Sequence, residues 1–175
     1  TCRTAGFNTV DQASLTDSSK LLSSMLMFIG GAPAGTAGGI KVTTVALLAL
    51  TLRSFLRGHS DVNVFRRRIS PALVQRSLCI FIVGILMMMS ASMIVSFSQI
   101  GSGSSFIDVF FELASAVGTV GVSTGVTMEA TAMTRVVLCL FMFAGRVGPL
   151  TLVLSLSGKS DDSTFRYPEG SIMVG

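Results

Sequence analysis

The sequence predicts an all-α membrane protein built from repeated units around a central pore, each with a membrane helix, a re-entrant pore helix with its filter loop, and a second membrane helix. Half of the 175 residues are hydrophobic, 13% are charged and the mean hydropathy is +0.72, which is typical of membrane proteins. Long apolar segments alternate with glycine-rich ones, and irregular backbone at membrane depth is tolerated only inside protein or beside a water-filled cavity. A short motif also occurs twice, at a spacing that predicts an internal repeat.

Positive charge is concentrated in one part of the chain. Seven of the 13 lysine and arginine residues lie between Lys41 and Arg76, and the formal net charge is +4. By the positive-inside rule, this stretch indicates a cytoplasmic loop between membrane segments. Nucleic-acid binding is disfavoured because neither an aromatic stacking pattern nor a binding motif accompanies the arginines. The three cysteines show no CxxC spacing, which favours free thiols over a metal site or a disulfide framework.

Residues 1–57 are predicted to be the end of one repeat. A motif near their start, Thr4-Ala5-Gly6-Phe7-Asn8-Thr9, has the pattern T-x-G-x-x-T. This pattern returns 115 residues later as Thr119-Val120-Gly121-Val122-Ser123-Thr124. The same offset aligns Gly30 with Gly145, two glycines that interrupt the long apolar segment after each motif. Two landmarks at one offset indicate an internal structural repeat.

The apolar segment from Leu21 to Phe55 is much too long for a single span of about 20 residues. It contains a glycine-rich break at residues 30–41, in which Pro33 and five glycines weaken helix formation. We therefore expect a membrane helix that is unwound near its middle. The alternative is two short helices joined by a loop in water. Such a loop would favour charged residues, and none occurs before Lys41.

A basic cytoplasmic linker is expected at residues 58–71, followed by another repeat at residues 72–157. The first apolar run of this repeat, Ala72 to Phe97, is long enough to span a membrane. A polar turn rich in glycine and serine follows at residues 98–105.

The apolar run at residues 106–117 is too short to span a membrane, which favours a re-entrant pore helix. Ser105 and Asp108 have the spacing of a capping box at its start. The partial negative charge at the C-terminal end of the helix would favour a cation in the segment that follows. Asp108 and Glu112 share one face of this helix, and we expect both to serve capping and solubility rather than ion attraction.

Residues 118–125 are predicted to form a selectivity filter. None of these side chains is charged and three of the eight residues are glycine, so the backbone is free to take extended or left-handed conformations. A row of backbone carbonyl oxygens can replace the hydration shell of a cation, as in the TVGYG loop of potassium channels. Thr119-Val120-Gly121 matches the first three letters of that loop.

The last membrane helix is expected at residues 132–156, interrupted by Gly145-Arg146-Val147-Gly148-Pro149. An arginine at membrane depth is costly and usually faces a cavity or partner groups. Arg146 either caps carbonyls freed by Pro149 or faces the glycine-rich break from below the filter. A cytoplasmic tail is expected at residues 158–175.

Several motifs together resemble the KtrB-type potassium-translocating subunits of bacterial Ktr systems, within the Trk/Ktr/HKT superfamily. They are the two T-x-G-x-x-T motifs, Gly35-Thr36-Ala37-Gly38-Gly39-Ile40-Lys41, Gly145-Arg146-Val147-Gly148-Pro149-Leu150-Thr151 and Arg166-Tyr167-Pro168-Glu169. The resemblance extends over the whole chain. It implies four repeats around one pore, with Gly6 and Gly121 as the third and fourth central filter glycines.

By this resemblance, the potassium-binding filter residues are Thr4, Ala5, Gly6, Phe7, Thr119, Val120, Gly121 and Val122. The intramembrane gating loop corresponds to residues 30–41. Its candidate gate residues, together with the arginine that faces the gate, are Gly31, Ala32, Pro33, Ala34, Gly35, Thr36, Ala37, Gly38, Gly39, Lys41 and Arg146. Ala32-Pro33-Ala34 departs from the expected glycine and serine, so Pro33 is expected to stiffen the loop.

The resemblance also implies partners and a location. The transported ion is potassium, with sodium as a further candidate, and the protein lies in the bacterial inner membrane as a multi-pass protein. The missing N-terminal half of the pore, a second copy in a homodimer and a KtrA-like cytosolic nucleotide-binding ring are the expected partners. No nucleotide is expected on this chain, because Ile40 stands before Lys41 where a Walker A motif has glycine.

A non-transporting membrane scaffold is the alternative function, because small residues also allow close helix packing. Scaffolding does not account for uncharged filter-like segments at the ends of short helices. An enzyme is disfavoured, because no paired carboxylates, Ser/His/Asp set or metal-ligand spacing lies in a segment that could form a cavity.

Overall fold

A computed structural model describes residues 4–33, 35, 37–58, 62–64, 67–98, 104–148 and 151. These residues are mostly helical, as predicted. The helices are η1 (Gln12–Ser14, a 3-10 helix), α1 (Asp17–Phe28), α2 (Val42–Leu56), α3 (Pro71–Ser98), α4 (Phe106–Val117), α5 (Val126–Glu129) and α6 (Ala132–Val147). Two short strands, β1 (Asn63–Val64) and β2 (Arg67–Arg68), pair antiparallel in the basic linker.

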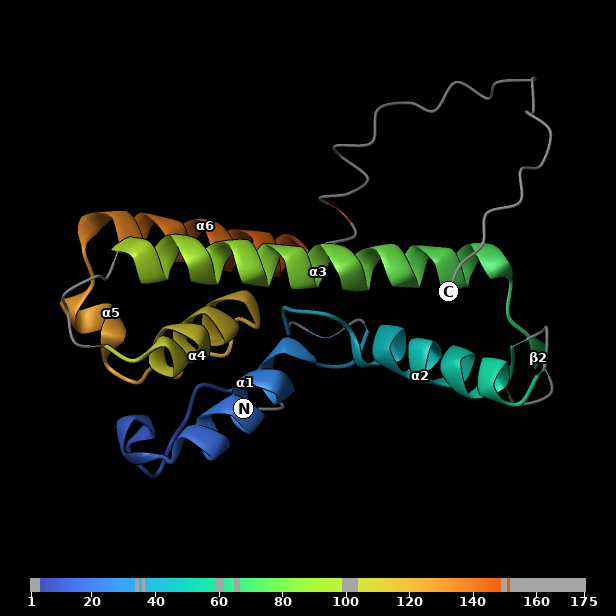
Figure 1. Ribbon diagram of the computed structural model, residues 1–175, viewed down its shortest axis with the longest axis horizontal. Helices are drawn as coiled ribbons and strands as arrows, with labels where there is room; N and C mark the ends of the chain where they lie inside the picture. Colours follow the sequence, from blue (N-terminus) through green and yellow to red (C-terminus); the bar gives the residue numbers. More distant parts are fainter. Residues whose placement is uncertain are drawn as a thin grey trace, which may run out of the picture.

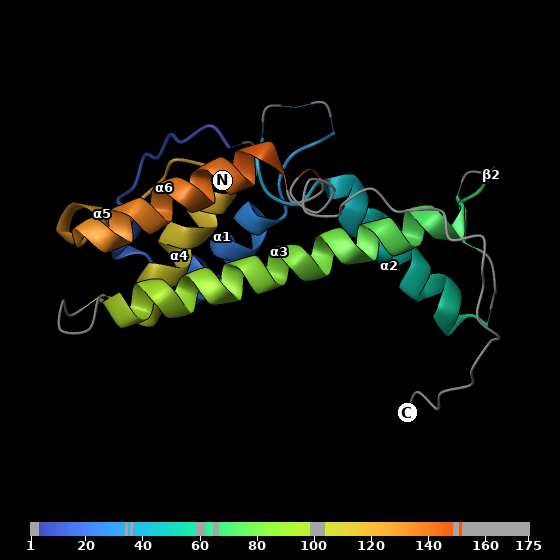
Figure 2. The same cartoon turned by 90° about the horizontal axis from the view of Figure 1, so that it is seen from above.

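Helix α3 runs along the length of the molecule, and α2, α4 and α6 pack against it (Figure 1). Helix α2 lies against one half of α3, and α4 and α6 lie against the other half, as Figure 2 also shows. Helix α4 contacts α1, α3 and α6. The short helix α4 is therefore enclosed by three other helices, and it positions the segment that follows it.

The core of the described residues is centred on α4. Every residue from Phe111 to Val117 is buried, including the polar Glu112 and Ser115. Apolar side chains from α1, α3 and α6, such as Met27, Val95 and Leu138, complete the core. A short helix that is buried on most sides can hold the backbone at its C-terminal end in one position.

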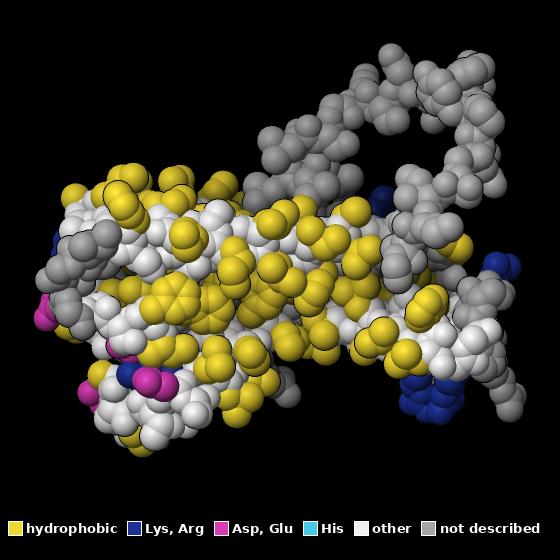
Figure 3. All heavy atoms as spheres, in the orientation of Figure 1, with side chains coloured by type: hydrophobic (Ala, Val, Ile, Leu, Met, Phe, Trp, Pro, Cys, Tyr) yellow, Lys and Arg dark blue, Asp and Glu magenta, His cyan; other side chains and the backbone are white. Residues whose placement is uncertain are grey.

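Large apolar side chains also cover the outside of the helices. In the described part of the chain, α3 is the one helix with the length and apolar composition to cross a membrane, and α2 is a shorter apolar helix. Leu86, Met93 and Phe97 of α3 are well exposed. Figure 3 shows hydrophobic side chains between the two ends of the molecule, with acidic and some basic side chains at one end and basic side chains at the other.

Helices α1 and α6 begin in the same way, 115 residues apart. The Thr16 hydroxyl accepts a hydrogen bond from Ser19 N (3.4 Å), and the Thr131 hydroxyl accepts one from Thr134 N (3.3 Å). A side-chain oxygen at the N-cap satisfies a backbone N–H that has no partner within the helix. The offset found in the sequence motifs therefore also relates the two helix starts.

The capping box predicted at the start of α4 is wrong. Ser105 is the N-cap of α4 but makes no capping hydrogen bond with its side chain, and Asp108 is paired with a distant lysine instead. Helix α6 ends at Val147, where Gly148 takes a positive φ of 89°, inside the interruption predicted at residues 145–149. The expected tail and the gate residues Ala34 and Thr36 lie outside the described residues.

Candidate functional site: two filter segments and a loop

The two predicted filter segments share an unusual backbone. Thr4 (φ 51°) and Thr119 (φ 52°) are the only non-glycine residues with positive φ in the described part of the chain. Two residues further on, Gly6 (75°) and Gly121 (90°) also have positive φ. A β-branched residue in this region is strained and persists only where its surroundings enforce it. Both segments therefore alternate the sign of φ in the same order, 115 residues apart.

The two segments lie face to face. A Cβ on Gly6 would lie 2.9 Å from the Val120 carbonyl oxygen and 3.8 Å from the Gly121 carbonyl oxygen. A Cβ on Gly121 would lie 3.8 Å from the Gly6 Cα. Two successive carbonyl oxygens of one segment are therefore on the side that faces the other segment.

The C-terminal end of α4 fixes the start of the second segment. The backbone N–H groups of Gly118, Thr119 and Val120 donate to the carbonyls of Ala114 (2.8 Å), Ala116 (3.1 Å) and Ser115 (2.9 Å), respectively. The Val120 and Val122 side chains are buried in the core beside α4. Because these two side chains are buried in the core, they hold the backbone between them in place on the core side.

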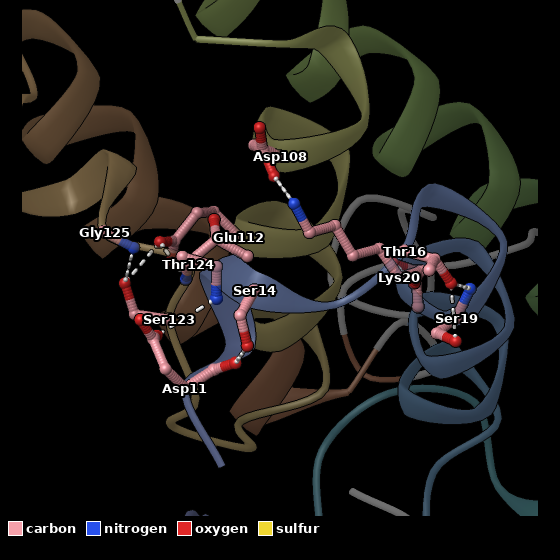
Figure 4. Close-up of polar contacts among 12 residues, drawn as sticks. Asp11, Ser14, Thr16, Ser19, Lys20, Asp108, Glu112, Ser123, Thr124 and Gly125 are labelled. Carbon is pink, nitrogen blue, oxygen red and sulfur yellow. Dashed lines mark hydrogen bonds and ion pairs between the residues drawn. The ribbon is translucent and has the colours of Figure 1, made fainter.

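Glu112 holds the residues that follow the second segment (Figure 4). This carboxylate is only 6% exposed. Its Oε1 accepts hydrogen bonds from Thr124 N (3.0 Å) and from the Ser123 hydroxyl, and its Oε2 accepts one from the Thr127 hydroxyl (3.1 Å). The expectation of a solubilising or capping role for Glu112 is therefore wrong, because the carboxylate is an internal acceptor.

Replacing Glu112 with glutamine should destabilise the protein by about 1–3 kcal/mol. The amide keeps one oxygen acceptor but places an NH₂ donor against another donor, which leaves a buried hydrogen bond unmade. Thermal unfolding of the purified protein in detergent measures the effect. Glu129→Gln is the matched control, since Glu129 is exposed on α5. Equal stability of the two variants would contradict this role.

A second buried charge links α1 to α4. Lys20 Nζ lies 2.7 Å from Asp108 Oδ1, and their side chains are 8% and 21% exposed (Figure 4). The two residues are 88 positions apart, so local sequence patterns gave no signal for this pair. The ion pair joins the helix that follows the first predicted filter segment to the helix that precedes the second one.

Lys20→Met should cost about 3 kcal/mol or more of unfolding free energy, because it leaves the Asp108 carboxylate without its partner in a partly buried place. The double variant Lys20→Met/Asp108→Leu should regain most of that loss. Chemical denaturation of the three proteins measures both steps. A double variant less stable than Lys20→Met would show that the pair is not the relevant interaction.

The glycine-rich break between α1 and α2 is a loop whose two ends are joined by backbone hydrogen bonds. Gly30 N donates to the Ile40 carbonyl (2.7 Å), and Ile40 N donates to the Phe28 carbonyl (3.1 Å). The Ile40 side chain is 1% exposed and packs where Gly84 of α3 leaves room for it. These contacts close the loop at its base.

The loop also contacts the base of the second predicted filter segment. Gly38 N donates to the Thr119 hydroxyl (2.9 Å), and Lys41 Nζ donates to the Ala37 carbonyl (2.6 Å). Of the predicted gate residues, Gly38 is therefore brought directly against a predicted filter residue.

Arg146 lies on the last turn of α6, next to the second predicted filter segment. It is exposed and lines a cavity of about 650 Å³ together with Thr119, Gly121 and Val122. Gly145 makes this placement possible, because a Cβ there would lie 2.0 Å from the Val117 carbonyl oxygen. The backbone of α6 thus packs directly on the C-terminal end of α4.

Comparisons with known proteins agree with the sequence motifs. The family model described as TrkH, cation transport protein, matches residues 1–167. The chain is 35% identical to Ktr system potassium uptake protein D and 34% identical to Ktr system potassium uptake protein B of Bacillus subtilis (strain 168), over 99% and 100% of its length. It is 36% identical, over its whole length, to the potassium/sodium uptake protein NtpJ of Enterococcus hirae.

The matches cover only part of each relative. The chain spans 38% of each of the two Bacillus proteins and 40% of the Enterococcus protein. These descriptions name transport or uptake rather than catalysis, in agreement with the prediction that the chain is not an enzyme.

Proposed function

Because this chain belongs to the TrkH family of cation transport proteins, we propose that it supplies two filter segments and the gating loop of a KtrB-like potassium uptake pore in a bacterial cell membrane. The observation that carries this proposal is the alternating φ at residues 4–7 and 119–122, in two segments that face each other. Along a strand of constant φ, successive carbonyls point to opposite sides. Alternating the sign of φ turns successive carbonyls to the same side, and rings of such oxygens select potassium by replacing its hydration shell.

Potassium is the proposed cargo. The relatives from Bacillus are named potassium uptake proteins, and the relative from Enterococcus is named a potassium/sodium uptake protein. Sodium is the further candidate ion. The filter segments use uncharged backbone oxygens, and these favour a cation without binding it so tightly that it fails to leave.

Two segments form half of a ring. The other two filter segments would come from the part of the relatives' length that this chain does not span. The Ktr relatives are named as parts of a system, which supports association with other subunits. We assign these subunits to a second copy of the transporter and to a KtrA-like cytosolic ring that binds nucleotide.

The membrane would surround the apolar middle of the molecule. Figure 3 shows hydrophobic side chains between an end with both acidic and basic side chains and an end with basic ones, and α3 is long enough to cross. By the positive-inside rule, the end with β2 and the C-terminus of α2 is cytoplasmic. The filter segments then open toward the outside, with α4 as a re-entrant pore helix.

The loop at residues 30–41 would be the gate below this filter. It lacks charged side chains apart from Lys41, and Gly38 lies against the base of the filter. Arg146 lines the adjoining cavity, where its charge opposes the entry of potassium.

Uptake in cells without their own potassium transporters tests this function. Expression of the complete transporter containing this chain should restore growth at low external potassium. Radioactive rubidium uptake should be suppressed by excess potassium much more strongly than by excess sodium. Membrane-inserted protein that supports no uptake, or that is suppressed equally by both ions, would contradict the proposal.

A further inference from the structure

We propose that the loop docks on the filter through the Thr119 hydroxyl, so that docking of the loop and binding of potassium at the inner end of the filter compete for the same oxygen. This inference rests on the proposed function and adds a direct coupling between gate and filter. Thr119 acts in it as a positioning residue for the loop.

The contact is close and specific. Gly38 N donates to Thr119 Oγ1 over 2.9 Å, although the two residues are 81 positions apart in the chain. A Cβ on Gly38 would lie 2.7 Å from Thr119 Cγ2, 2.8 Å from Thr119 Oγ1 and 3.0 Å from the Val117 carbonyl oxygen. Only glycine lets the loop approach this closely, and the surface that it meets is the base of the filter.

The equivalent threonine of the other segment lacks this contact. Thr4 has the same φ and the same place in the motif, yet no hydrogen bond joins its side chain to the loop among the described residues. One of two matching filter threonines is therefore occupied by the loop. The pair provides an internal control, because Thr4 and Thr119 differ in this contact.

The filter is the fixed partner and the loop is the movable one. Three backbone hydrogen bonds from residues 118–120 hold the base of the filter to α4. The loop is fastened at residues 28–31 and 40–42, on either side of Gly38. Disturbing the contact should thus move the loop and leave the filter in place.

Competition follows from the hydroxyl itself. A threonine hydroxyl has two acceptor lone pairs and one donor; the Gly38 N–H uses one lone pair and holds its positively polarised hydrogen against the oxygen, which opposes a cation on the other. Release of the loop frees that lone pair for an ion or its water at the inner end of the filter. Coupling of this kind is reciprocal, so potassium at this site would favour the undocked loop.

Potassium uptake in a double-mutant cycle tests this coupling in the complete transporter. Gly38→Ala should raise uptake about two- to tenfold in the wild-type background, the range expected when one neutral hydrogen bond is lost. The same factor should appear in the Thr4→Val background. In the Thr119→Val background, Gly38→Ala should change uptake by a factor near one, because the loop is already released. Thr119→Ser, which keeps the hydroxyl, should restore the sensitivity to Gly38→Ala.

Rates are normalised to the amount of folded protein in the membrane. If Gly38→Ala changes potassium uptake by the same factor in the Thr119→Val and Thr4→Val backgrounds, the proposed coupling is wrong. A decrease caused by Gly38→Ala in the wild-type background would overturn it as well. In both cases normal uptake by the unmodified transporter leaves the proposed pore standing, whereas absence of that uptake contradicts the proposed function itself.

Discussion

Replacing Gly121 with serine is expected to reduce the preference for potassium over sodium by about tenfold or more. Gly121 has a φ of 90°, and a side chain in a left-handed conformation costs roughly 1–2 kcal/mol, which corresponds to about tenfold in an equilibrium. Relief of this strain would turn the carbonyls of Val120 and Gly121 away from Gly6. Because ion preference depends on the placement of these oxygens, the altered filter should discriminate poorly. Uptake of potassium measured against competing sodium gives the result.

Gly125→Ser separates this effect from general strain. Gly125 also has a positive φ, of 98°, but nothing lies within 4 Å of the position of a Cβ there. Its carbonyl is beyond the two facing segments. This variant should lose some stability and keep its ion preference. Unchanged discrimination in Gly121→Ser, or an equal loss in Gly125→Ser, would contradict the assignment of the filter.

Replacing Arg146 with alanine is expected to raise potassium uptake roughly tenfold. Two unit charges about 4 Å apart interact by about 1 kcal/mol in water and about 4 kcal/mol at an effective dielectric of about 20. Arg146 is exposed in the cavity beside Thr119 and Gly121, so the lower part of this range applies to an ion that passes there. Arg146→Lys should give an intermediate rate, because it keeps the charge but loses the planar guanidinium.

Arg135→Ala is the control for this prediction. Arg135 lies near the start of α6, donates to the Met128 carbonyl over 3.2 Å and does not line the cavity. Its removal should leave the rate per folded molecule close to that of the wild type. Equal rates for the wild type, Arg146→Ala and Arg146→Lys would leave Arg146 with a structural role alone.

Helix positions could largely be predicted from the sequence, because apolar segments and glycine-rich breaks are local signals. The helix predicted at residues 106–117 coincides with α4. Thr16, which caps α1, was not predicted, although the 115-residue offset relates it to Thr131, the threonine that caps α6. The repeat of the T-x-G-x-x-T motif is consistent with the positive φ that Thr4 and Thr119 share.

The contacts that hold the site together could not be predicted in this way. The ion pair of Lys20 with Asp108 and the hydrogen bond of Gly38 with Thr119 join residues more than 80 positions apart. Periodicity and motif spacing describe single segments, whereas these contacts depend on how the helices pack. Glu112 looked like a surface carboxylate because its burial arises from the neighbouring helices and the segment after the filter.

Location of bound thallium ions in crystals of the complete transporter is the most direct test of the central claim, that residues 4–7 and 119–122 line one ion pathway. Thallium is a potassium substitute whose anomalous scattering marks its position. The account predicts anomalous density between Gly6 and Gly121, in contact with the carbonyl oxygens of Val120 and Gly121, and loss of this density in Gly121→Ser. Well-ordered crystals with thallium bound elsewhere and none between these two glycines would contradict it.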